Sequence, residues 1–311
     1  MNKKFSLLIK ILFTLSLFYI IFKKLNLNEF YPIFFKINPY YLIILPILWG
    51  LSILLSGYKW NLILSHYKLN IAYKEAFNLY WIGSFFNNFL PSSFGGDGYK
   101  LYALNKKFPN KKGQILSSMV LERGIGFFTL ILTMLIFGSF FISKIFSNPL
   151  LFSIYFGSFI STLILVIIFI CFSNFEIERE FKNYFLNKIV KLYNILVSFK
   201  DKKILMESMI ISLIFILISV FSFWCYFKAF NYEISFLLLL FLIPLIQFSE
   251  LVPFTINSLG IKEGLAIYLF YMFSIHTEVV LAVYVIARIL SLMFTSSGGL
   301  AYIYYDPEKK D

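Results

Sequence analysis

The fold class follows from residues 114–142, which read QILSSMVLERGIGFFTLILTMLIFGSFFI. Glu122 and Arg123 are the charged residues of this run, and the rest is apolar or small and uncharged. A helix of about 20 apolar residues crosses a hydrocarbon layer roughly 30 Å thick, so the run is long enough to span a bilayer. Backbone polar groups inside lipid bond within their own segment, which predicts an α-helix.

Runs of the same kind recur along the chain. Hydrophobic residues make up 59% of the 311 residues and charged residues 14%, whereas a soluble domain carries about 25% charged residues. We therefore predict an all-α, polytopic integral membrane protein that forms a single transmembrane domain over residues 1–311. Six transmembrane helices are expected, at 5–22, 40–57, 114–142, 150–172, 204–230 and 277–304. Pro, Gly and charges interrupt two further apolar stretches, 76–91 and 235–275, which predicts broken or re-entrant elements.

The net charge of +12 concentrates in segments between the predicted spans. In a soluble protein it would suggest nucleic acid, but Lys and Arg beside spans follow the positive-inside bias, so we expect no nucleic-acid partner. The basic segments 58–75 and 92–113 are expected in the cytoplasm, which predicts a multi-pass protein of the cytoplasmic membrane with a cytoplasmic N-terminus. The stretch 76–91 joins these two segments and therefore reads as re-entrant. An ordinary short span with a basic outer loop is the alternative.

Apolar residues recur at helical spacing over about 176–200, between basic and acidic ones. This pattern predicts an amphipathic cytoplasmic helix. It could lie on the lipid surface or dock a partner, or it could be a connector that rests on the protein's own helices.

The two interrupted regions order the same parts alike: a Pro, a Gly, an acidic residue followed by Gly, and later an intramembrane Arg. These parts are Pro91, Gly96, Asp97 and Arg123 in the first region and Pro253, Gly260, Glu263 and Arg288 in the second. The distance from Gly to Arg along the chain is nearly matched. The pattern predicts an internal repeat, with repeat-like halves at about 76–142 and 235–304.

Charged side chains inside a bilayer are costly and usually face a polar site. Glu122 and Arg123 are adjacent, which points them about 100° apart on a helix, so each should find a partner elsewhere. We expect Asp97 to pair with Arg123, and Glu263 with Arg288. Broken segments in corresponding places of two halves are typical of transporters. Alternatively, the ion pairs only lock helices together.

The blocks Asn88-Phe89-Leu90-Pro91, Gly96-Asp97, Leu121-Glu122-Arg123, Leu259-Gly260-Ile261-Lys262-Glu263 and Ala287-Arg288 resemble the lysylphosphatidylglycerol synthase transmembrane region, also called the UPF0104 or flippase-like membrane family. The resemblance covers nearly the whole chain. The family's first block usually reads Pro-Gly-x-x-Gly-Glu and its second Gly-x-Arg-Glu, where this chain has Ser92, Asp97 and Lys262.

The resemblance implies a flippase or transporter that moves an anionic or aminoacylated phospholipid, or a lipid-linked intermediate, across the cytoplasmic membrane. In relatives a soluble C-terminal domain makes the lipid. Only six residues follow Tyr305 here, so we expect no soluble catalytic domain, and phosphatidylglycerol lysyltransferase activity would need a separate lipid synthase as partner. The phospholipid headgroup is expected to meet Asn88, Pro91, Gly96, Asp97, Lys100, Glu122, Arg123, Glu250, Lys262, Glu263 and Arg288.

In this hypothesis the two broken elements form a polar cavity, in which the Arg and Lys residues bind phosphate and the acidic residues hold those cations or take an amine. No catalytic residue, cofactor or metal is expected. Two alternatives stay open: a membrane-embedded transferase, and a membrane component of lysyltransferase-type lipid modification that acts as a structural or regulatory partner.

Overall fold

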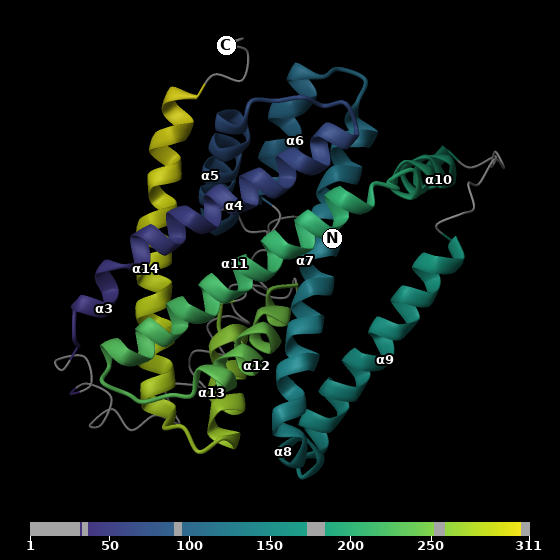
Figure 1. The fold of residues 1–311 in the computed structure, drawn as a ribbon. Helices are drawn as coiled ribbons and strands as arrows, with labels where there is room; N and C mark the ends of the chain where they lie inside the picture. Colours follow the sequence, from purple (N-terminus) through teal and green to yellow (C-terminus); the bar gives the residue numbers. More distant parts are fainter. Residues whose placement is uncertain (1–31, 33–36, 90–94, 173–183, 252–258, 306–311) are drawn as a thin grey trace. The chain divides into compact units, whose positions relative to one another are not determined.

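The computed structural model describes residues 32, 37–89, 95–172, 184–251 and 259–305. Within these ranges every regular element is a helix and no strand is present, as the all-α prediction requires (Figure 1). The elements are α3 (Tyr40–Ile43), α4 (Leu45–His66), α5 (Tyr73–Phe89), α6 (Gly95–Lys107), α7 (Lys112–Gly138), η1 (Ser139–Phe141), α8 (Ile142–Phe146), α9 (Pro149–Phe172), α10 (Tyr184–Val197), α11 (Lys202–Ala229), α12 (Phe236–Gln247), η2 (Phe248–Leu251), α13 (Ile261–Met272) and α14 (Thr277–Tyr304).

Four helical segments of the described chain are long and apolar enough to cross a membrane. They are Tyr40–His66, Lys112–Phe146, Lys202–Ala229 and Thr277–Tyr304, and each contains or closely matches a predicted span. The predicted span at 150–172 corresponds to α9, whose described apolar part is the shorter Pro149–Ile164. The predicted span at 5–22 lies outside the described residues.

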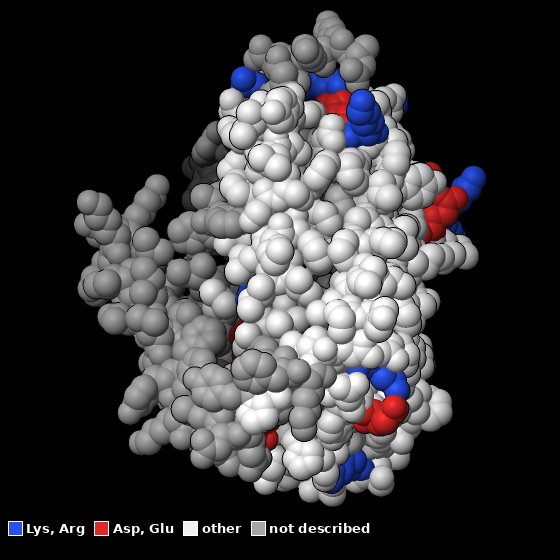
Figure 2. Space-filling view, turned by 90° about the vertical axis from the view of Figure 1, so that its left-hand side faces the viewer, with Lys and Arg blue, Asp and Glu red and all other residues white. Residues whose placement is uncertain are grey.

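The surfaces of these helices suit a lipid environment. Large apolar side chains stand exposed on all four segments, among them Ile47, Ile136, Ile210 and Met293, each more than half exposed. Charged side chains are sparse on the face drawn in Figure 2, where most described atoms belong to uncharged residues. Exposed apolar surface of this extent fits contact with lipid tails. The chain is therefore a multi-pass membrane protein.

The second span extends further than its pattern predicted. We expected it to end at Gly57, with a cytoplasmic segment beginning at residue 58, but α4 continues to His66. Burial explains the longer helix, because Trp60, Ile63 and Leu64 are completely buried at helical spacing. Lys59 thus lies within a helix that is long enough to cross a membrane, and the loop expected from residue 58 begins only after His66. The cytoplasmic location of this segment stays a prediction.

The described residues fall into two compact units. The first consists of the described residues within the ranges 1–53, 80–99 and 216–305. In this unit α14 packs against α5 at backbone distance, because a β-carbon on Gly298 would lie 3.1 Å from the carbonyl carbon of Trp81. The indole N–H of Trp81 also donates to the Ser297 hydroxyl at 3.0 Å.

The second unit consists of the described residues within the ranges 54–79 and 100–215. Its centre is α7, which packs against α9 and α10. The Tyr67 hydroxyl donates to the Ile195 carbonyl of α10 at 3.0 Å, and burial raises the pKa of this hydroxyl above its usual value of 10.0. The Tyr155 hydroxyl of α9 donates to the Leu135 carbonyl of α7 at 2.7 Å.

Both interrupted regions have a helix on each side of a segment outside the described residues. The first has α5 before and α6 after, and the second has α12 with η2 before and α13 after. This shared layout fits the repeat, which stays a prediction, as does re-entry into the membrane. The predicted amphipathic helix at 176–200 corresponds in its described part to α10.

Candidate functional site

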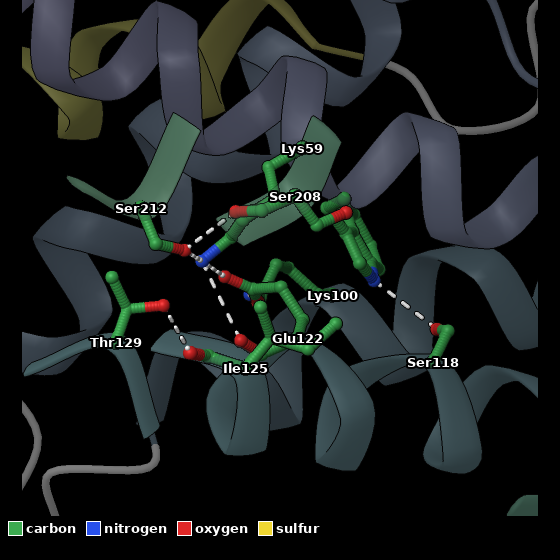
Figure 3. Close-up of polar contacts among 9 residues, drawn as sticks. Lys59, Lys100, Ser118, Glu122, Ile125, Thr129, Ser208 and Ser212 are labelled. Atoms are coloured by element: carbon green, nitrogen blue, oxygen red, sulfur yellow. Dashed lines mark hydrogen bonds and ion pairs between the residues drawn. The ribbon is translucent and has the colours of Figure 1, made fainter. Parts of the chain in front are cut away.

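Three charged side chains meet in the interior of the second unit. Lys59 comes from α4, Lys100 from α6 and Glu122 from α7, and we call these three residues the lysine–glutamate cluster. The Lys59 ammonium lies 3.1 Å from Glu122 Oε1, and the Lys100 ammonium lies 4.0 Å from Glu122 Oε2. One carboxylate therefore bridges two lysines, one at each oxygen (Figure 3).

Neutral groups from three helices complete the cluster. The Lys59 ammonium donates to the Ser212 hydroxyl of α11 at 3.3 Å and to the Glu122 backbone carbonyl at 3.4 Å (Figure 3). The Lys100 ammonium lies over the indole ring of Trp60, 4.9 Å from its centroid. That indole N–H donates to the Ser118 hydroxyl at 3.1 Å, which fixes the ring against α7.

Helical spacing explains why α7 presents a polar face at this point. Positions three or four apart lie on one side of a helix. The buried polar residues of α7 that follow this spacing are Ser118, Glu122, Thr129 and Thr133, with Gly126 between them. A β-carbon on Gly126 would lie 3.5 Å from the Lys59 ammonium, in ordinary contact, so Gly126 lies directly beside that group.

The cluster is shielded from water. Lys59 and Glu122 are each 8% exposed and Lys100 is 4% exposed. A charge at the centre of a membrane-spanning helix costs about 2.5–3.5 kcal/mol on insertion scales, and burial of charges in protein is also costly unless they are paired. Three buried charges at one place therefore compensate one another or serve a ligand. Two ammonium groups and one carboxylate, with hydroxyl and indole groups around them, can bind an anion such as a phosphate.

A second charged pair lies in the first unit. The Arg288 guanidinium of α14 lies 3.3 Å from Glu263 Oε1, so the predicted pairing of these two residues is confirmed. Glu263 Oε2 accepts a hydrogen bond from the backbone N–H of Gly260 at 2.7 Å and thereby caps the first turn of α13. Gly260 has φ 83°, a conformation that favours glycine. Glu263 is 3% exposed, and it orients Arg288 by holding it from a fixed helix end.

Two other predicted site residues make helix contacts in the first unit. The Asn88 side-chain amide donates to the Thr295 hydroxyl of α14 at 2.8 Å. The Gly96 backbone N–H donates to the Asn87 side-chain oxygen at 2.8 Å, and a β-carbon on Gly96 would lie 2.7 Å from the carbonyl carbon of Gly83. The first contact joins α5 to α14 and the second joins α6 to α5. Substrate contact at either residue stays a prediction.

The remaining predicted site residues are spread over both units. Asp97 and Lys262 are half-buried in the first unit, and Arg123 is exposed on α7 in the second. Asp97 and Arg123 thus belong to different units, and their pairing stays a prediction. Glu250 falls in η2, its side chain outside the described structure, and Pro91 lies outside the described residues.

Sequence reasoning missed Lys59, Trp60 and Ser212 as parts of the site. The prediction assigns Lys59 to a basic cytoplasmic segment because Lys68 and Lys74 follow it. A signal was present: apolar residues continue after it at Leu62, Ile63 and Leu64, so the charge is flanked on both sides. Within the described ranges, no three His, Cys, Asp or Glu side chains gather closely enough to hold a metal ion.

Comparison with known proteins identifies the family of this chain. The chain is similar to the UPF0104 membrane protein of Methanocaldococcus jannaschii, with 25% identity over 314 aligned positions that cover 94% of this chain and 91% of the relative. No solved structure matches the chain significantly. The family model described as the lysylphosphatidylglycerol synthase TM region matches residues 7–299. Because this match covers almost the whole length, the chain belongs to the lysylphosphatidylglycerol synthase transmembrane-region family.

Proposed function

We propose that this protein moves an anionic or aminoacylated phospholipid, or a lipid-linked intermediate, across the cytoplasmic membrane. The observation that carries the proposal is the lysine–glutamate cluster, a set of charges buried among membrane-spanning helices. Intramembrane charges usually mark the path of a polar or charged substrate. A phospholipid that crosses a bilayer must bring its charged headgroup through the hydrocarbon layer, and buried lysines lower that barrier.

The charge types match such a headgroup. Lysine binds phosphate as a point charge, and arginine binds it through paired donors. The cluster supplies Lys59 and Lys100, and the first unit supplies Arg288 on a carboxylate support. Carboxylates near the same cations suit an amine, such as that of an aminoacylated headgroup. We place the N-terminus in the cytoplasm on the positive-inside bias.

A translocation assay tests the proposal. The full chain is reconstituted into vesicles that contain a fluorescent phosphatidylglycerol, and the fraction of label that an impermeant quencher reaches is followed over time. We expect wild type to accelerate the exchange between leaflets, and Lys100→Met and Arg288→Ala to abolish the acceleration. Lys106→Met is the matched control, because Lys106 is an exposed lysine on the same helix as Lys100.

The headgroups compared are phosphatidylglycerol, an aminoacylated phosphatidylglycerol and a polyisoprenyl-phosphate sugar. Movement of one class that needs Lys100 names the substrate. If wild-type protein, shown to be folded, moves none of them, autonomous lipid transport is wrong.

A second candidate function follows from the family description, which names a synthase. In this alternative the chain is the membrane component of a lysyltransferase-type lipid modification and acts with a separate lipid synthase. It predicts that Lys100→Met leaves lipid modification intact, whereas deletion of α10 in the basic segment abolishes it.

A further inference from the structure

The two lysines of the cluster hold Glu122 in unequal ways. The Lys59 ammonium contacts Glu122 Oε1 at 3.1 Å and is further fixed by the Ser212 hydroxyl at 3.3 Å. The Lys100 ammonium is 4.0 Å from the other carboxylate oxygen. A separation of 4.0 Å is longer than a direct charge-assisted hydrogen bond, which spans about 2.7–2.9 Å. The contact between Lys100 and Glu122 is therefore the looser of the two.

We propose that Glu122 is an internal counter-ion, and that a phosphodiester group displaces its carboxylate from Lys100 while Lys59 retains it. This inference rests on the proposed function and divides the site into two parts. Lys100 is the cation that meets the ligand, and Lys59 is a positioning residue that keeps Glu122 nearby. Without ligand, the carboxylate occupies the place of the phosphate, which explains how the cluster can be closed and buried.

A serine beside the cluster offers a second donor for the same ligand. Ser208 lies one helical turn before Ser212 on α11, and its backbone carbonyl accepts from the Ser212 hydroxyl at 2.8 Å (Figure 3). The Ser208 hydroxyl is completely buried and has no hydrogen-bond partner among the described residues. A buried hydroxyl without a partner is costly, and a phosphate oxygen would accept a hydrogen bond from it.

The charge of the cluster selects the class of phosphate. Lys59, Lys100 and Glu122 carry two positive charges and one negative charge. A phosphodiester carries one negative charge at neutral pH, so its binding would bring the sum of these groups to zero. A phosphate monoester or a diphosphate carries more negative charge and would leave an excess in a low-dielectric interior, where the cost is high. The site is therefore expected to prefer diesters.

Trp60 provides a built-in reporter. Its ring lies under the Lys100 ammonium, so movement of that charge toward a phosphate changes the indole's surroundings and its fluorescence. Replacing Trp49, Trp81 and Trp224 by Phe in the full chain leaves Trp60 as the single tryptophan. The emission is then titrated in detergent with dihexanoylphosphatidylglycerol.

We expect a saturable change in emission, with three distinct responses of the variants. Lys100→Met weakens binding on the order of tenfold or more, because it removes the cation that meets the phosphate. Glu122→Gln tightens binding on the order of tenfold, because it removes the competing anion while keeping the side-chain shape. Lys106→Met leaves binding unchanged. A thermal unfolding trace for each variant checks that it is folded.

The opposite signs separate an internal counter-ion from a structural lock. If Glu122→Gln weakens binding as Lys100→Met does, or if Lys100→Met binds like the Lys106→Met control, the inference is wrong. Absence of any saturable change in wild type also overturns it. Where Glu122→Gln unfolds, Lys100→Met still tests whether Lys100 meets the ligand, and binding equal to that of Lys106→Met overturns the inference.

Further ligands identify the source and class of the phosphate. Glycerophosphoglycerol tests whether the headgroup alone suffices, and dihexanoylphosphatidic acid, a monoester, should bind more weakly than the diester. Binding with the expected signs but without translocation in vesicles would refute the proposed function alone. Translocation without these signs would refute the internal counter-ion alone.

Discussion

Alanine at Gly96 should separate α5 from α6, whereas alanine at Gly98 on the same helix should not. A β-carbon on Gly96 would lie 2.7 Å from the Gly83 carbonyl carbon and 2.9 Å from its α-carbon, and closer still to the carbonyl oxygen. Ordinary contact begins at 3.4 Å, and these atoms belong to the backbone, so no side chain can rotate away. The two helices must move apart by several tenths of an ångström.

Overpacking of this kind costs about 1–3 kcal/mol. With a shift of about 2–4 °C per kcal/mol for a chain of this size range, Gly96→Ala should lower the midpoint of thermal unfolding by about 2–12 °C. A β-carbon on Gly98 meets nothing within 4 Å, so Gly98→Ala should leave the midpoint unchanged or raise it through better helix propensity. Both midpoints are measured in detergent by tryptophan fluorescence. Equal midpoints for the two variants would refute the close approach.

Three further predictions concern buried polar contacts. Lys59→Met should lower the free energy of unfolding by about 3–5 kcal/mol, because it leaves Glu122 without its nearest cation. If the double variant with Glu122→Leu restores the midpoint of thermal unfolding, the prediction is supported. If the two losses add, it is contradicted. Glu263→Gln should cost about 1.5–3 kcal/mol by weakening the contacts with Arg288 and the α13 cap, whereas a midpoint equal to wild type in thermal unfolding would refute that role. Burial raises the pKa of the Tyr67 hydroxyl, so the stability that the protonated hydroxyl provides is complete below pH 10.0 and is lost as the pH rises further. Tyr67→Phe should therefore reduce the dependence of the unfolding free energy on pH across that range. An unchanged pH profile would contradict this.

The sequence predicted the helices best where charge and hydropathy change together. The last span was expected at 277–304, and α14 has the same bounds, because polar residues and a turn with Ser274 at φ 60° precede it. The second span is predicted to end at Gly57, because the segment after it carries Lys59, Lys68 and Lys74. The helix continues to His66 with Trp60, Ile63 and Leu64 buried, and the charge of Lys59 within it is balanced by Glu122, a residue far away in the chain that leaves no local pattern.

The candidate site was also predictable only in part from the sequence. The pair of Glu263 with Arg288 was predicted, because the repeat-like order of motifs drew attention to both residues, and the pair is present. The expectation that Glu122 finds a partner other than its neighbour is also confirmed, yet the identity of Lys59 could not be predicted. Hydropathy shows that a buried charge needs a counter-charge, but only the packing of α4 against α7 shows which residue supplies it.

The position of Lys59 also has a consequence for how the chain is made. Its carboxylate partner lies 63 residues later, and at a synthesis rate of about 5–20 residues per second that gap lasts about 3–13 s. Lys100 is also synthesised before Glu122, so two ammonium groups emerge from the ribosome ahead of their shared anion. During this interval α4 must hold an ammonium group near lipid, with its long stem reaching toward the headgroup layer. We therefore expect α4 to reach its final position only after α7 has been inserted, so that the order of helix insertion becomes part of how this protein folds.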